Sequence, residues 1–344
     1  MFQNAFKRAF GRSSKISPKY RLYSQSFQYQ RFNNKQSKSF SQLLVDPTSR
    51  KYLAFALGGG SLFYITHLEE APVTGRTRFM WLPRSLELKI GNYSYNSMLG
   101  QTKGSILPAN NPLTVKVTKI FDRIVDAAQR DPSIDKQLLE GVNWQIHIVD
   151  DPKAPPNAFV LPGGKVFVFS SILGICKNDD GLATVLSHEF AHQLARHTAE
   201  NLSKAPIYSI LGAILYTVTG ADIFNRLILD GFLKMPASRQ METEADHIGL
   251  MIMSRACFHP QEAVKLWGRM AEFERRVKGS GNFSPEFLST HPASDRRIEN
   301  MQSWMPKAQE LYSQSSCGTG GYYDSFHNIF SGQTRGEGPV FTWG

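Results

Sequence analysis

The sequence contains few cysteines, with only Cys176, Cys257 and Cys317 among its 344 residues. Three cysteines exclude a scaffold held together by several disulfides, because at most one bridge can form. None of the three belongs to a C-x-x-C pair, so the usual cysteine-based metal site is excluded as well.

Acidic residues are absent from residues 1–45, which are rich in Arg, Lys, Ser, Gln and aromatic residues. In residues 1–51, 11 bases stand against the single acid Asp46, and this difference of +10 equals the formal net charge of the whole chain. The remaining chain is neutral, which argues against a folded domain that binds nucleic acid. No apolar core follows Met1, so residues 1–45 resemble a mitochondrial transit peptide and not a secretory signal. A disordered basic tail is the alternative.

Charged residues are missing again from residues 52–68, YLAFALGGGSLFYITHL. At about 1.5 Å per residue a helix of this length approaches the roughly 30 Å of a bilayer core, which predicts a transmembrane helix. Arg50 and Lys51 precede it and Glu69 and Glu70 follow it. The positive-inside rule then leaves the N-terminus in the matrix and the rest of the chain in the intermembrane space. A buried core helix is the alternative.

The motif H-E-F-A-H at residues 188–192 is the strongest chemical signal in the sequence. On a helix, His188 and His192 are four residues apart and lie on one face, where two imidazoles can hold one zinc ion. Glu189 lies between them and can take a proton from the attacking water. The flanking residues are apolar and free of Gly and Pro, as a helix buried beside a cleft requires.

A third zinc ligand is expected in E-T-E-A-D, residues 242–246, because the Gly and third His of the long metzincin motif are absent. Glu242 and Asp246 share a helical face, so Glu242 can bind the metal while Asp246 accepts the free N–H of a ligating histidine. Glu244 points elsewhere, and His197 is expected at the helix end or behind a ligand. Two histidines, one Glu and a water make an open catalytic zinc site, with one Zn²⁺ per chain.

A second uncharged run covers residues 205–221 and lies between the two motifs. A full crossing there would put the two histidines and Glu242 on opposite sides of the membrane, where they could not share a metal. We therefore expect residues 205–229 to form a buried helix or a shallow, membrane-proximal hairpin.

We expect the rest of the chain to form one α+β, mostly α, domain over residues 113–312, between an irregular linker with short extended pieces at 69–112 and a C-terminal tail at 313–344. Helical spacing marks residues 113–129, and alternation marks a strand at 143–149. Residues 157–161 and 165–169 flank Pro-Gly-Gly and predict a β-hairpin. An Asp of residues 178–181 is expected to cap the helix that follows.

The hairpin before the motif helix can present a free edge to a substrate peptide, with Asn157, Ala158 and Phe159 as candidate substrate-binding residues. An ordinary sheet is the alternative. In the oxidising intermembrane space one disulfide can form, and Cys257 with Cys317 is preferred because Cys176 lies just before the motif helix.

In order, H-E-F-A-H, E-T-E-A-D and Thr290-His291-Pro292 followed by Arg297 resemble the integral-membrane zinc peptidases that include the HtpX heat-shock and CAAX prenyl proteases. With the transit-like N-terminus and P-N-A-F-V-L-P-G-G-K at 156–165, the chain is most similar to the Oma-type metalloendopeptidases of the mitochondrial inner membrane.

This resemblance implies a gluzincin-like domain in which His188, His192 and Glu242 bind zinc, Glu189 is the base and His291 stabilises the tetrahedral intermediate. It also implies an ATP-independent, stress-activated endopeptidase that cleaves inner-membrane proteins in quality control and forms homo-oligomers. A zinc hydrolase of a small molecule and a chaperone-like protein with a vestigial metal site are the alternatives. The intact Glu189 disfavours the second, because a structural site would not need it.

Overall fold

The computed structural model describes residues 46–219, 239–279, 291, 295–315 and 317. The predicted transit peptide, the end of the 205–229 segment and nearly all of the tail after residue 315 lie outside these residues. The chain divides into two compact units, Met1–Ala54 and Phe55–Gly344, and every element that carries the site belongs to the second.

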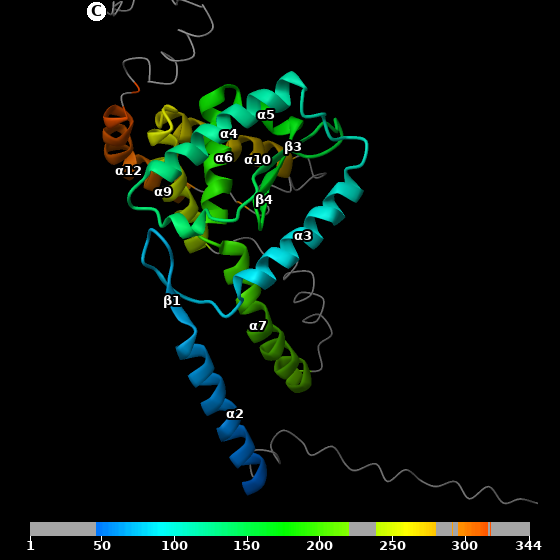
Figure 1. The fold of residues 1–344 in the computed structure, drawn as a ribbon. Coiled ribbons are helices and arrows are strands. Elements are labelled where there is room, and N and C mark those ends of the chain that lie inside the picture. Colours follow the sequence, from blue (N-terminus) through cyan, green and yellow to red (C-terminus); the bar gives the residue numbers. More distant parts are fainter. Residues whose placement is uncertain (1–45, 220–238, 280–290, 292–294, 316, 318–344) are drawn as a thin grey trace, which may run out of the picture. The chain divides into compact units, whose positions relative to one another are not determined.

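The described chain is mostly helical, with two small sheets, as the sequence predicted (Figure 1). The N-terminal part contains α2 (Pro47–Thr66), β1 (Leu68–Glu70), β2 (Thr77–Phe79), α3 (Arg84–Gln101) and α4 (Pro112–Arg130). The middle part contains a short 3-10 turn (Lys136–Leu138), β3 (Gln145–Val149), β4 (Ala158–Leu161), β5 (Lys165–Phe169), a second 3-10 turn (Ser170–Ile172), α5 (Leu173–Cys176), α6 (Asp179–Leu194) and α7 (His197–Thr219). The last part contains α9 (Arg239–Arg255), α10 (Gln261–Gly279) and α12 (Asp295–Gln314).

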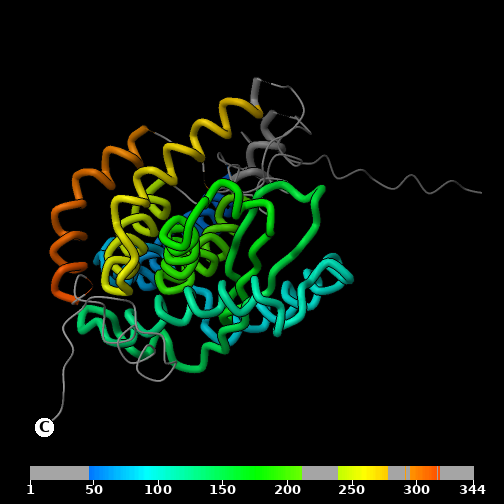
Figure 2. The backbone as a smooth tube through the Cα atoms, turned by 90° about the horizontal axis from the view of Figure 1, so that it is seen from above, coloured from blue at the N-terminus to red at the C-terminus, as the bar shows by residue number. Residues whose placement is uncertain are grey.

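Helix α6 is the central element of the peptidase core. Every residue from Gly181 to Leu194 is buried, because α6 packs against α9, α10, α4 and strand β4. Figure 2 shows α10 and α12 side by side in yellow and orange, where they contact each other. The Asn178 side chain caps α6 by accepting from the Gly181 amide at 2.7 Å. Our prediction of an Asp cap was therefore wrong by one residue, although the side-chain oxygen of Asn178 caps the helix as an Asp carboxylate would.

The three-stranded sheet has the order β3-β5-β4, with β3 parallel and β4 antiparallel to β5. The predicted hairpin is confirmed, and its turn needs glycine twice, since Gly163 and Gly164 have φ of 92° and 88°. Within the described residues β4 is an outer strand, and its unpaired side faces α6. The sheet thus offers a strand edge directly beside the motif helix.

The linker predicted over residues 69–112 contains the short strands β1 and β2 and also the 18-residue helix α3, which the sequence did not predict. The sequence of α3 has little amphipathic pattern, so contacts distant in sequence hold it in place. At Gly91 the helix lies so close to the hairpin that an added Cβ would come within 2.1 Å of the Pro162 carbonyl oxygen. Arg196 donates to Glu87 at 2.8 Å and ties α3 to the end of α6.

The transmembrane helix predicted over residues 52–68 requires a correction. None of the helices in the described part of the chain is both long and apolar enough to span a bilayer. Helix α2 starts earlier than predicted, so its 20 residues include Arg50 and Lys51, and it ends at Thr66. The buried-helix alternative is also wrong, because α2 has no buried residue and Phe55 is 79% exposed.

The segment after residue 205 also differs from the prediction of a buried helix. Residues 197–219 form one continuous helix, α7, and Ile207, Tyr208 and Ile210 are exposed on it. Pro206 is accommodated inside this helix.

The structure contains the disulfide Cys257–Cys317, the pair that we preferred from the sequence, whereas Cys176 is buried and free. The bridge joins Cys257, just after α9, to Cys317, just after α12. The two cysteines are 60 positions apart in sequence, and His291 and Arg297 lie between them.

Candidate active site

Helix α6 presents three functional side chains from one buried turn. His188 and His192 lie one turn apart, and their Nε2 atoms approach to 3.1 Å. Both rings are almost completely buried, as is Glu189 between them in sequence. The i, i+4 spacing therefore produces the paired imidazoles that the sequence predicted.

Glu242 of α9 completes this pair from the neighbouring helix. Its two carboxylate oxygens lie 3.3 Å from His188 Nε2 and 3.3 Å from His192 Nε2. The close approach of the helices depends on Gly249, where an added Cβ would lie 3.1 Å from the His188 backbone nitrogen. A larger residue at 249 would push α9, and Glu242 with it, away from α6.

His291 closes the cluster from a segment distant in sequence. Its Nδ1 lies 2.9 Å from Glu242 and 3.2 Å from His188 Nε2, and its Nε2 lies 3.6 Å from Glu189. The ligand atoms of His188, His192, Glu242 and His291 all fall within 4.8 Å of one another. The sequence suggested only a role for His291 toward the reacting carbonyl, and the structure adds that it can reach a metal.

The donor set of this cluster fits a metal ion. The Nε2 atoms of His188 and His192 face each other 3.1 Å apart, and the buried Glu242 Oε2 lies 3.3 Å from His188 Nε2 and 3.1 Å from the Arg297 guanidinium. Neutral imidazoles and a carboxylate all present lone pairs. Bringing these lone pairs together in a buried place destabilises the fold unless a cation or protons lie between them. Three nitrogens and one oxygen are typical ligands of a transition metal.

Glu189 lies beside the cluster without being part of it. Burial raises the pKa of its carboxyl, while the nearby His291 and His188 act in the opposite direction. The main-chain amide of Val160, in β4, donates a hydrogen bond to the same carboxylate. Strand β4 thus fixes the side chain that the sequence assigned as the base, and nothing in the sequence pattern pointed to Val160.

The outer face of His188 is held by a charged pair. His188 Nδ1 lies 3.1 Å from Asp246, and Arg297 donates to both oxygens of Asp246 at 2.7 Å. The Arg297 guanidinium also stacks over Trp267 at 3.6 Å. This is the position in which the sequence placed Asp246, and the buried residue is Arg297 whereas Arg296 is exposed.

His192 has a different support. Its Nδ1 lies 2.8 Å from His197 Nδ1, and His197 Nε2 lies 2.9 Å from Glu244. The expectation that His197 lies behind a ligand agrees with this geometry. Glu244 was missed, because only its direction away from Glu242 could be read from the helical spacing.

A family description, "Peptidase family M48", matches residues 116–305 of the sequence. The chain belongs to peptidase family M48. It is 65% identical over 305 residues to "Mitochondrial metalloendopeptidase OMA1" of Saccharomyces cerevisiae, with 88% of each chain covered. The Schizosaccharomyces pombe protein of the same name is 37% identical over 300 residues, covering 86% of this chain and 84% of the relative. "Beta-barrel assembly-enhancing protease" of Escherichia coli is 25% identical over 293 residues, covering 80% and 55%.

These relationships identify the chain as a metalloendopeptidase, related to proteins that are named mitochondrial. The small-molecule hydrolase and the chaperone-like protein are therefore set aside. The His and Glu cluster lies inside the matched region, and it is compatible with a metal ion.

The edge of β4 in this M48 peptidase is formed by alternate residues. The Phe169 amide donates to the Asn157 carbonyl at 2.9 Å, so Asn157, Phe159 and Leu161 direct their main-chain groups to β5. Ala158 and Val160 then direct theirs to the outer edge. Of the three predicted substrate-binding residues, the structure therefore places only the main chain of Ala158 at the free edge.

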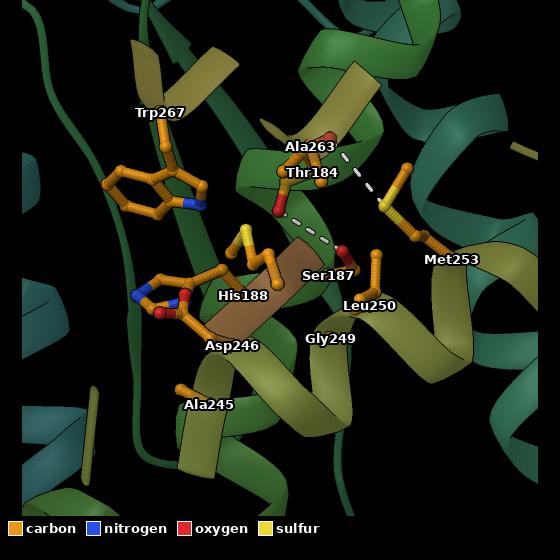
Figure 3. A pocket seen from close by; sticks show the side chains of 11 residues that line it. Thr184, Ser187, His188, Ala245, Asp246, Gly249, Leu250, Met253, Ala263 and Trp267 are labelled. Atoms are coloured by element: carbon orange, nitrogen blue, oxygen red, sulfur yellow. Dashed lines mark hydrogen bonds and ion pairs between the residues drawn. The ribbon is translucent and has the colours of Figure 1, made fainter. Parts of the chain in front are cut away.

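A small pocket of the M48 domain lies behind His188 rather than in front of it (Figure 3). It is lined by Thr184, Ser187, His188, Ala245, Asp246, Gly249, Leu250, Met253, Ala263, Trp267 and Met301. Figure 3 shows His188 and Asp246 next to each other near Trp267, and hydrogen bonds that join Ser187 to Thr184 and Thr184 to Met253. The residues of this pocket pack behind His188 and support it as a candidate metal ligand. The pocket is too enclosed by apolar side chains to receive an extended peptide.

Proposed function

We propose that the chain is a zinc-dependent, ATP-independent endopeptidase of the mitochondrial inner membrane, which cleaves misfolded or regulatory inner-membrane proteins in stress-activated quality control. The observation that carries the catalytic part is the buried His188–His192–Glu242 group with Glu189 beside it. The family membership and the mitochondrial names of the relatives support the rest.

His188, His192 and Glu242 would hold the zinc, since two imidazoles and one carboxylate are the ligands of the open catalytic site. Zinc, when bound, polarises the scissile carbonyl and makes water more acidic. The Asp246 carboxylate, 3.1 Å from His188 Nδ1, favours a proton on that nitrogen and so leaves His188 Nε2 free to face the metal.

Glu189 takes the proton of the attacking water and passes it to the leaving amine. Its buried carboxylate is aimed by the Val160 amide, and a raised pKa brings its proton affinity closer to that needed in both steps. His291 lies between Glu189 and Glu242, where its imidazole can donate to the oxyanion that develops on the substrate.

The substrate is proposed to bind as an extra strand on β4. The outward main-chain groups of Ala158 and Val160 lie on the side of the sheet that faces α6, so an added strand would run past Glu189. A peptide fits this edge better than a compact small molecule does.

Removing the metal is expected to abolish cleavage reversibly. The purified full chain, incubated with an unfolded protein, should lose its activity in 1,10-phenanthroline and regain it when zinc is added back, with about one zinc per chain by elemental analysis. Magnesium added to the same sample serves as the control, because it prefers oxygen ligands. Cleavage that persists in the metal-free protein would contradict the proposal.

The inner-membrane location is proposed from α2. Helix α2 exposes large apolar side chains, among them Tyr52, Phe55, Leu57 and Leu62, and such a surface needs a lipid or protein partner. The proposal also puts the N-terminus in the matrix and the catalytic domain in the intermembrane space. Homo-oligomers, as in the resembling family, are part of this proposal.

Alkaline carbonate is expected to leave the chain in the membrane pellet of mitochondria, and protease is expected to degrade the catalytic domain once the outer membrane is ruptured. Leu57→Glu should shift the chain toward the soluble fraction, because Leu57 is 63% exposed and the charge would meet lipid and not the core. Gln309→Glu, at an exposed position of α12, is the control and should stay in the pellet. A catalytic domain that is still protected after rupture would place it in the matrix.

A further inference from the structure

The loop between β1 and β2 reaches the supporting side chains of the metal site. Arg76 donates to both oxygens of Glu200 at 2.9 and 2.6 Å, and it donates to Glu244 Oε2 through Nη2 at 2.8 Å and Nε at 3.2 Å. The hydroxyl of Thr74 donates to the other oxygen of Glu244. Both carboxylate oxygens of Glu244 are therefore held by a loop that lies about 170 residues away in sequence.

Glu244 in turn determines which nitrogen of His192 carries a proton. The carboxylate can only accept, so His197 Nε2 donates to it at 2.9 Å. A neutral His197 then has a bare Nδ1, which accepts from His192 Nδ1 at 2.8 Å. This leaves His192 Nε2 without a proton and directed at Glu242 and His188, as a metal ligand must be.

The chain of contacts is well shielded from water. The side chains of Glu200 and Glu244 are 0% and 3% exposed, whereas Arg76 is 20% exposed. An ion pair of this kind is little screened. Removing the guanidinium leaves the buried Glu244 carboxylate without its arginine, whereas Glu200 keeps Lys204 at 2.5 Å.

The loop is built to hold this position. Val73, a β-branched residue, has φ of 73°, which is a strained conformation that neighbouring contacts must maintain. Ala71 and Arg76 pair through a backbone hydrogen bond of 2.8 Å, and Phe79 of β2 stacks on Tyr64 of α2 with ring centroids 4.9 Å apart. Backbone strain next to a site-directed Thr and Arg is typical of a functional segment.

We propose that Thr74 and Arg76 are positioning residues of the metal site, which hold Glu244 and, through His197, fix the orientation and the tautomer of His192. The inference rests on the proposed function, since it takes His192 as a ligand. It makes the segment that directly follows α2 a determinant of metal retention.

The test compares Arg76→Gln with Arg255→Gln in the purified full chain, loaded with Co²⁺ as a spectroscopic probe. Arg255 is a matched control. It lies on the same helix as Glu244 but away from the site, it is 29% exposed, and it pairs with the buried Asp131 at 2.8 Å. Arg76→Gln should shift the cobalt absorption band and speed metal release to a chelator. The increase should stay within the roughly 10–100-fold that loss of a ligand's direct partner gives, because Arg76 acts through Glu244 and His197. Arg255→Gln should leave both at the wild-type values.

Two further variants keep the test decisive if Arg76→Gln does not fold. Thr74→Val removes one hydroxyl at constant volume and should give a smaller shift in the same direction. Arg76→Lys keeps the charge without the planar fork and should be intermediate. Wild-type release rates and spectra in the Thr74 and Arg76 variants would overturn the inference. A wild-type chain that holds cobalt but cleaves nothing would count against the proposed function alone.

Discussion

Replacing Glu189 by Gln is expected to lower the rate of peptide hydrolysis by about 10²–10⁴-fold, the usual contribution of a positioned general base. Gln has the shape of Glu but cannot take a proton from water. The Val160 amide can still donate to the Gln carbonyl, so the side chain should keep its place. Single-turnover cleavage of an unfolded protein substrate measures the loss.

Elemental analysis of the same Glu189→Gln sample is the control, and it should find the wild-type metal content because Glu189 is not among the clustered ligands. The variant should also bind substrate and hold it uncut, which makes its captured peptides the most direct record of what the enzyme cleaves. A variant that cleaves at the wild-type rate, or one that has lost its metal, would remove Glu189 from the role of base.

The second large effect is expected from Glu242→Gln, which should lose most of its bound metal and, with it, all cleavage. Glu242 supplies the only carboxylate of the cluster and contacts both imidazoles at 3.3 Å. A neutral amide binds zinc far more weakly than a carboxylate does, so the loss of affinity should exceed the roughly 10–100-fold that outer partners contribute. Competition with a zinc-selective chelator measures it.

Glu262→Gln provides a matched comparison, since Glu262 is also a buried acid and pairs with Arg269 at 2.8 Å, away from the cluster. It should bind metal as the wild type does, even if it unfolds at a lower temperature. Equal metal affinity in Glu242→Gln and Glu262→Gln would show that Glu242 is not a ligand.

The parts of the site that the sequence predicted are those set by local periodicity. His188 and His192, and likewise Glu242 and Asp246, are four residues apart on helices whose existence follows from their apolar pattern. The β4–β5 hairpin followed from Pro-Gly-Gly between two alternating runs. In each case the information lies within about ten residues of the chain.

What could not be predicted depends on contacts between distant segments. Arg76 and Thr74 lie in a stretch without a strong pattern, and their role arises only because the loop meets Glu244, which is 168 residues from Arg76. Helix α3 forms for the same reason, since tertiary packing at Gly91 replaces an amphipathic pattern. Hydropathy predicted a membrane span over residues 52–68 because it counts apolar residues, but it does not show where the helix begins and ends.

The outer edge of β4 determines which substrates this enzyme can distinguish. Only Ala158 and Val160 direct main-chain groups outward, and the Val160 amide is already occupied by Glu189. On the proposed mode of binding, three backbone groups remain for a substrate, and all peptides carry their counterparts. The edge would thus select substrates by their conformation and not by their residue type. A segment whose backbone amides are hydrogen-bonded within its own fold cannot pair with β4, whereas an unfolded segment can. Discrimination between intact and damaged proteins would then follow from the geometry of one strand, without a separate recognition domain.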